Sequence, residues 1–67
     1  MSGYSYRLEK KSGTKWEKVK GLMTLPQSQK AWLDAKKNLP NGTRIRMLLI
    51  SGGGASTVES LQTVKRE

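Results

Sequence analysis

The 67-residue chain contains no cysteine and no histidine. The absence of cysteine excludes disulfide bonds and thiolate metal sites, and the absence of histidine removes the other common zinc ligand and the most frequent general acid or base. Only five aspartate and glutamate residues are present, and they are spread through the chain. We therefore expect a protein that holds no metal and no cofactor and that is not an enzyme.

Long apolar segments are also missing. The longest apolar run, from Met47 to Ile50, has four residues, and the chain starts without a basic leader and apolar stretch. These patterns predict neither a signal peptide nor a membrane span, and they favour a cytoplasmic protein. Because so short a chain can bury only a small core, residues 1–67 are expected to form a single domain. No pattern indicates an oligomeric state.

Charge is the most abundant feature that the chain does have. Thirteen lysine and arginine residues stand against five acidic ones, which gives a formal net charge of +8 and a sequence pI of about 10.2. A strongly positive surface attracts polyanions and the acidic faces of other macromolecules. We therefore expect a basic binding module whose partner is nucleic acid or an acidic protein.

The first 20 residues have the pattern of a β-hairpin. Residues 4–10 alternate apolar and polar side chains, residues 11–14 form a polar turn in which Gly13 can take a positive φ, and a second strand begins near Lys15. Trp16 and Val19 lie three residues apart, so they share one face only if a β-bulge intervenes near residues 17–18. The size of Trp16 favours a core position. The alternative leaves it exposed on a basic sheet face.

A helix is predicted from Thr24 to Asn38. Thr24 and Gln27 have the spacing of a capping box, and Pro26 falls in the first turn, where its missing N–H costs no hydrogen bond. The predicted apolar stripe consists of Leu25, Trp32, Ala35 and Leu39, with Ala31 and Leu33 at its margins. One face of this helix is therefore expected to pack on a sheet.

The second half of the chain predicts one clear strand and one ambiguous segment. Residues 43–50 are rich in branched side chains and are bounded by turn residues, and the glycine run at 52–54 matches no phosphate-binding loop, so it is interpreted as a link. Residues 55–67 combine a second capping-box pattern with β-branched side chains. A strand is favoured there, because it would cover an open sheet edge, and a short helix is the alternative.

These elements predict an α+β fold with the order β-β-α-β and a favoured fourth strand. We expect a small antiparallel sheet of three or four strands, with one helix on the face that carries Tyr4, Tyr6, Leu8, Val19, Ile45, Met47 and Leu49. The opposite face then collects the candidate binding residues Arg7, Lys18, Lys20, Arg44 and Arg46, with Trp16 as a further candidate. This face suits the phosphate backbone of nucleic acid, and arginines there could also contact base edges.

A rival function is a regulator that docks on an acidic face of a larger protein, with Leu48, Ile50 or an exposed Trp16 as apolar anchors. The order of a Tyr-rich strand, a strand around residues 15–19, a Thr/Pro-capped helix and a strand at 42–46 resembles small phage- or prophage-encoded α+β proteins. The resemblance covers residues 4–50 and rests on pattern, without a diagnostic motif. It implies a host-regulatory role, such as inhibition of RNA polymerase, and it carries over no functional residue.

Overall fold

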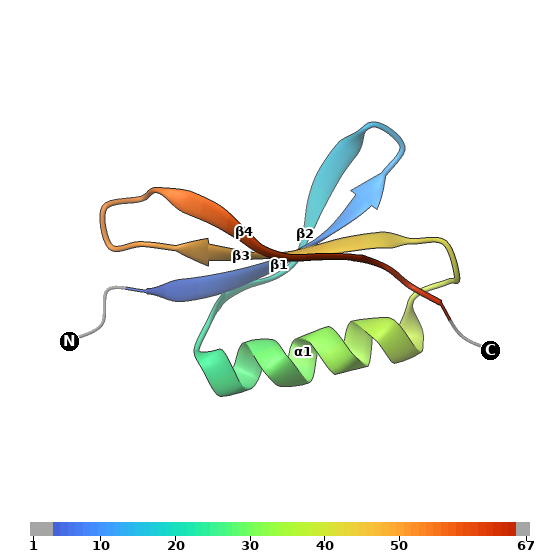
Figure 1. The fold of residues 1–67 in the computed structure, drawn as a ribbon, viewed down its shortest axis with the longest axis horizontal. Coiled ribbons are helices and arrows are strands. Elements are labelled where there is room, and N and C mark those ends of the chain that lie inside the picture. Colours follow the sequence, from blue (N-terminus) through green and yellow to red (C-terminus); the bar gives the residue numbers. More distant parts are fainter. Residues whose placement is uncertain (1–3, 66–67) are drawn as a thin grey trace.

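The computed structural model describes residues 4–65 of the chain. Its elements are β1 (Ser5–Ser12), β2 (Lys15–Met23), α1 (Leu25–Asn38), β3 (Arg44–Ile50) and β4 (Ser56–Thr63). The four strands form one antiparallel sheet in the order β2-β1-β3-β4, and α1 lies along one side of it (Figure 1). The predicted α+β fold is confirmed, and the ambiguous tail is a strand. Residues 66–67, the end of that predicted tail, lie outside the described residues.

The β1–β2 hairpin closes at the predicted turn, where Gly13 has a φ of 64°. Its register contains two irregularities, both of which place extra residues in β2. Lys18 lies opposite Glu9 and Lys20 lies opposite Leu8, so Val19 is the extra residue of a bulge. The predicted bulge therefore exists one to two residues later than expected, and it follows Trp16 by three positions.

Leu22 lies in the second irregularity and is the one described non-glycine residue with a positive φ, at 54°. A side chain with a Cβ is strained in this left-handed region. The Leu22 side chain is also 79% exposed, so it contributes little packing to offset the strain. The backbone at this position therefore favours glycine.

The helix begins where the capping box predicted. The Gln27 N–H donates to Thr24 Oγ1 at 3.4 Å, and the Thr24 N–H donates to Gln27 Oε1 at 3.0 Å. The side that faces the sheet carries the small residues Ser28, Ala31 and Ala35, which are buried. Small side chains let the helix approach the sheet closely, and Leu25 and Leu33, which were predicted along the stripe and at its margin, are exposed.

The core lies between α1 and the sheet. Its buried members are Leu8, Met23, Ala31, Ala35, Ile45, Met47 and Val64, with Tyr6, Trp32 and Leu39 packed around them. The expectation that Tyr4 and Val19 belong to this core is wrong, because Tyr4 precedes β1 and Val19 lies at the bulge, and both side chains are exposed. Val64 is fully buried in this core, and its N–H donates to the Thr43 carbonyl at 2.8 Å, so backbone pairing continues past the end of β4.

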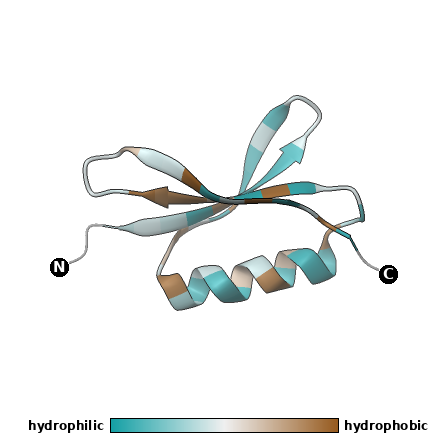
Figure 2. Ribbon diagram, viewed as in Figure 1, coloured by the Kyte–Doolittle hydropathy of each residue, from teal (hydrophilic) through white to brown (hydrophobic). Residues whose placement is uncertain are grey.

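Only one side of the sheet is covered. The helix contacts β1, β2 and β3, and within the described residues it makes no such contact with β4. The tip of the β1–β2 hairpin rises away from the helix (Figure 1), and this hairpin is mostly hydrophilic, whereas the end of β3 is apolar (Figure 2). No helix in the described part of the chain has the length and apolar character needed to span a membrane.

We predict that Leu22→Gly raises the free energy of unfolding by about 0.5–1 kcal/mol, because glycine removes the strain of the positive φ. Leu33→Gly is the control, since Leu33 is exposed in the middle of α1, where glycine lowers stability by about 1 kcal/mol. Urea denaturation followed by circular dichroism measures both changes. A Leu22→Gly protein less stable than the parent would show that position 22 is not strained.

Candidate functional site

The uncovered side of the sheet, here called the open face, is assembled from alternate residues of all four strands. Directly opposed residues of an antiparallel pair point to the same face. The register therefore joins Arg7 with Leu48, Glu9 with Lys18 and Arg46, and Lys11 with Trp16. Residues Leu8 and Met47, which alternate with these, are buried in the core, so the first group faces away from the helix.

Glu9 is the centre of an ion-pair cluster on the open face. Although it is charged, the residue is only 7% exposed. Its Oε1 accepts a hydrogen bond from Arg46 Nε at 2.7 Å and forms an ion pair with Arg46 Nη2 at 2.6 Å, and Arg7 Nε lies 3.3 Å from Oε2. A buried carboxylate requires such partners, because an unpaired buried charge is strongly destabilising. Glu9 thus holds two arginines at fixed positions on the sheet.

Trp16 lies beside this cluster. The Arg46 guanidinium carbon is 4.3 Å from the centroid of the indole ring, and Lys11 Nζ is 5.5 Å from it. Both are cation–π distances, which favour a cation over the electron-rich face of the ring. Trp16 therefore lies on the basic sheet face, as the alternative proposed, but it is half-buried there and not exposed. The core position favoured by its size is wrong. The open face carries no helix to bury the ring, which is half-buried by neighbouring cations.

Five of the six candidate residues share the open face, and Lys20 does not. Lys20 lies opposite Leu8 and borders a groove next to Asp34 and Leu39 of the helix side. Its expected position is wrong because the bulge at Val19 reverses the alternation after Lys18. The bulge therefore separates two lysines that strict alternation would place together.

The remaining cations of the open face are less constrained than Arg46. Lys18 and Arg44 are exposed and have no ion-pair partner within residues 4–65. Arg7 has a 37% exposed side chain, although its Nε is buried without a hydrogen-bond partner in the described part of the chain. Lys11 was not predicted as a site residue. Extending the alternation of Arg7 and Glu9 by two positions would have identified it.

The open face has an apolar side next to β4. Leu48 is buried between Arg7 and Val58 of the neighbouring strands, and Val58 and Leu61 are exposed. Leu61 lies opposite Arg46. The face therefore changes from cationic and aromatic at the β1–β2 hairpin to aliphatic at the β4 edge.

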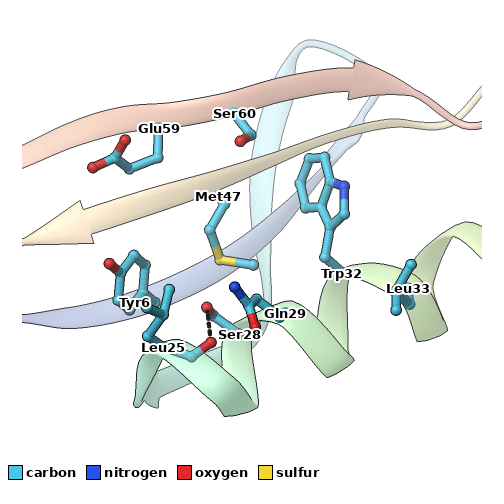
Figure 3. Close-up of a pocket in the computed structure, with 9 residues that line it drawn as sticks. All are labelled: Tyr6, Leu25, Ser28, Gln29, Trp32, Leu33, Met47, Glu59 and Ser60. Atoms are coloured by element: carbon cyan, nitrogen blue, oxygen red, sulfur yellow. Dashed lines mark hydrogen bonds between the residues drawn. The ribbon is translucent and has the colours of Figure 1, made fainter.

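A separate groove of about 570 Å³ lies on the helix side, between α1 and β4. It is lined by Tyr6, Leu25, Ser28, Gln29, Trp32, Leu33, Met47, Glu59 and Ser60 (Figure 3). Trp32 and Leu25 project from α1 toward the sheet in this view, and Glu59 and Ser60 come from β4. The groove exists because α1 does not extend over β4.

The acidic side chains of the described residues are dispersed over the structure. Within residues 4–65, no three acidic side chains come close enough to hold a metal ion. Glu9 and Glu17 point to opposite faces, because Glu17 lies opposite Lys10 and Glu9 opposite Lys18. The arrangement offers fixed positive charge with a tryptophan beside it, which is the chemistry of anion recognition.

No protein-family model, no curated protein and no solved structure matches this chain. The resemblance to phage-encoded proteins stays a prediction.

We predict that Arg46→Gln lowers the free energy of unfolding by about 2 kcal/mol, because it removes charged hydrogen bonds to the buried Glu9 carboxylate. Arg44→Gln is the matched control, since Arg44 lies two residues earlier on the same strand, is exposed, and should change stability by less than about 0.5 kcal/mol. Denaturant titration measures both. In a Glu9→Gln background the cost of Arg46→Gln should fall, and equal costs in both backgrounds would contradict the proposed pairing.

Proposed function

We propose that the protein binds nucleic acid without catalysis, through the phosphate backbone and the cations of the open face. The observation that carries the proposal is the gathering of Arg7, Lys11, Lys18, Arg44 and Arg46 on one uncovered sheet surface, where Glu9 is the single acidic residue among those of residues 4–65 that share this surface. Phosphate contacts from such side chains fix the register of a protein on nucleic acid and supply most of its affinity.

The internal pairing of the face separates two roles. Arg46 is held by Glu9 and Trp16, and its side chain is 25% exposed, so it is a positioning residue for the surface. Arg7, Lys11, Lys18 and Arg44 supply the charge that reaches the ligand. Because Glu9 is neutralised by Arg46, these four cations retain their attraction for phosphate.

Trp16 supports the same function in a limited way. Its ring already lies within cation–π distance of Arg46 and Lys11, so a base that stacks on a ring face held by either cation must displace that cation. Contacts with the phosphate backbone of the nucleic acid need no such displacement. We therefore propose a ligand preference set by charge, with little discrimination between base sequences.

The proposal predicts strongly salt-dependent binding. Four phosphate contacts to a duplex give a slope of about −3.6 in a plot of log K against log salt concentration. Fluorescence anisotropy of labelled oligonucleotides, single-stranded and duplex, measures it between about 50 and 200 mM salt. The absence of binding to either ligand at about 50 mM salt would contradict the proposal and favour an acidic protein partner.

The matched variants exploit the two faces of the molecule. Lys18→Gln combined with Arg44→Gln removes two open-face charges and should reduce the magnitude of the slope by about 1.8. Lys20→Gln combined with Lys30→Gln removes the same charge from the helix side, where both residues are exposed, and should leave the slope nearly unchanged. An equal effect of both double variants would show that the ligand does not use the open face.

A further inference from the structure

The charge of the chain is distributed unequally along its length. No lysine or arginine occurs between Met47 and Val64, although thirteen are present in the whole chain. This nearly neutral segment contains most of β3 and all of β4, and its one charged residue is Glu59. Two molecules that each carry +8 repel one another, and this segment is where the repulsion is weakest.

The two edges of the sheet differ in the same way. The β2 edge carries Lys15, Lys18 and Lys20 and two register irregularities, which are features that prevent a further strand from adding to an edge. The β4 edge carries no lysine and no proline, has one irregularity at Glu59, and exposes all eight of its residues. Its outer backbone therefore remains available for strand pairing.

Apolar side chains flank β4 on both faces. Val58 and Leu61 are exposed on the open face, and Leu61 is 62% exposed. On the helix side, the groove beside β4 presents Trp32 with the exposed Leu25 and Leu33 (Figure 3). Exposed aliphatic groups beside an unpaired strand edge are typical of an interaction surface.

We propose that β4 pairs antiparallel with β4 of a second copy of the chain, so that the protein is a homodimer with a continuous eight-stranded sheet. An acidic partner protein would be attracted to the cationic hairpin, whereas a neutral edge suits a copy of equal charge. A two-fold axis perpendicular to the sheet makes such a pairing isologous. It places both helices on one side, and it places Leu61 of each copy next to the shared edge.

The dimer keeps the two cationic hairpins apart. β2 is the strand farthest from β4 in the sheet order, so the two β1–β2 hairpins lie at opposite ends of the eight-stranded sheet. Both open faces lie on the same side, and both grooves meet beside the shared edge. A stable interface needs about 800 Å² per partner, which is about one sixth of the 4879 Å² surface of the described chain.

Sedimentation equilibrium tests the proposal on the unmodified protein. Across about 10 to 500 µM, which covers dissociation constants in the micromolar range, the mass should rise to twice the 7.5 kDa of the chain. Amide hydrogen exchange should slow in β4 as the concentration rises, and it should stay unchanged in β2. A protein that remains monomeric at the highest concentration would overturn the proposal.

A matched pair of substitutions locates the interface. Leu61→Lys places a charge on the β4 edge and should shift the dissociation constant upward at least tenfold, whereas Leu22→Lys makes the same change at the exposed β2 edge and should leave it unchanged. Ser60→Lys, on the same strand but facing the groove, should raise the dissociation constant as Leu61→Lys does, so it replaces that variant if Leu61→Lys disturbs the fold. Circular dichroism shows whether each variant is folded. A dimer that survives both β4 substitutions, or that is lost with Leu22→Lys, would show that β4 is not the interface.

Discussion

A single helix must cover a four-stranded sheet, and the rest of the structure follows from this constraint. A helix about 10 Å wide covers about two strands spaced about 4.8 Å apart. The contacts of α1 are with β1, β2 and β3, so the helix side of β4 and the whole opposite face lack a covering element. Within residues 4–65 no other element covers these surfaces, so the uncovered sheet has to be stabilised by its own side chains.

The Glu9 cluster provides that stabilisation. A carboxylate that is nearly buried on an uncovered face is compatible with folding because Arg46 donates a hydrogen bond to it and forms an ion pair with it, and Arg7 lies close by. The same contacts hold Arg46 against Trp16. The residues that stabilise the open face are therefore also part of the proposed ligand site. The ion pairs that stabilise the sheet also fix the cationic surface that we propose as the ligand site.

Local signals in the sequence predicted the elements well. The capping box at Thr24 and Gln27 and the turn at Gly13 depend on a few neighbouring residues, and both are present. Alternation placed Arg7, Lys18, Arg44 and Arg46 on one face. It failed at Lys20 because the bulge lies at Val19, one to two residues later than the spacing of Trp16 and Val19 indicated, and there it reverses the alternation after Lys18. Glu9 was also missed, because its burial depends on Arg46, 37 residues away along the chain.

The two tryptophans report directly on whether the open face contacts nucleic acid. Trp16 lies on the open face and Trp32 lies in the groove on the helix side, so their indole N–H signals report on opposite surfaces. In a ¹⁵N NMR titration with an oligonucleotide duplex, we predict a progressive shift of the Trp16 indole signal and a stationary Trp32 signal, because the open face binds the duplex. A shift of Trp32 with Trp16 unmoved would contradict it.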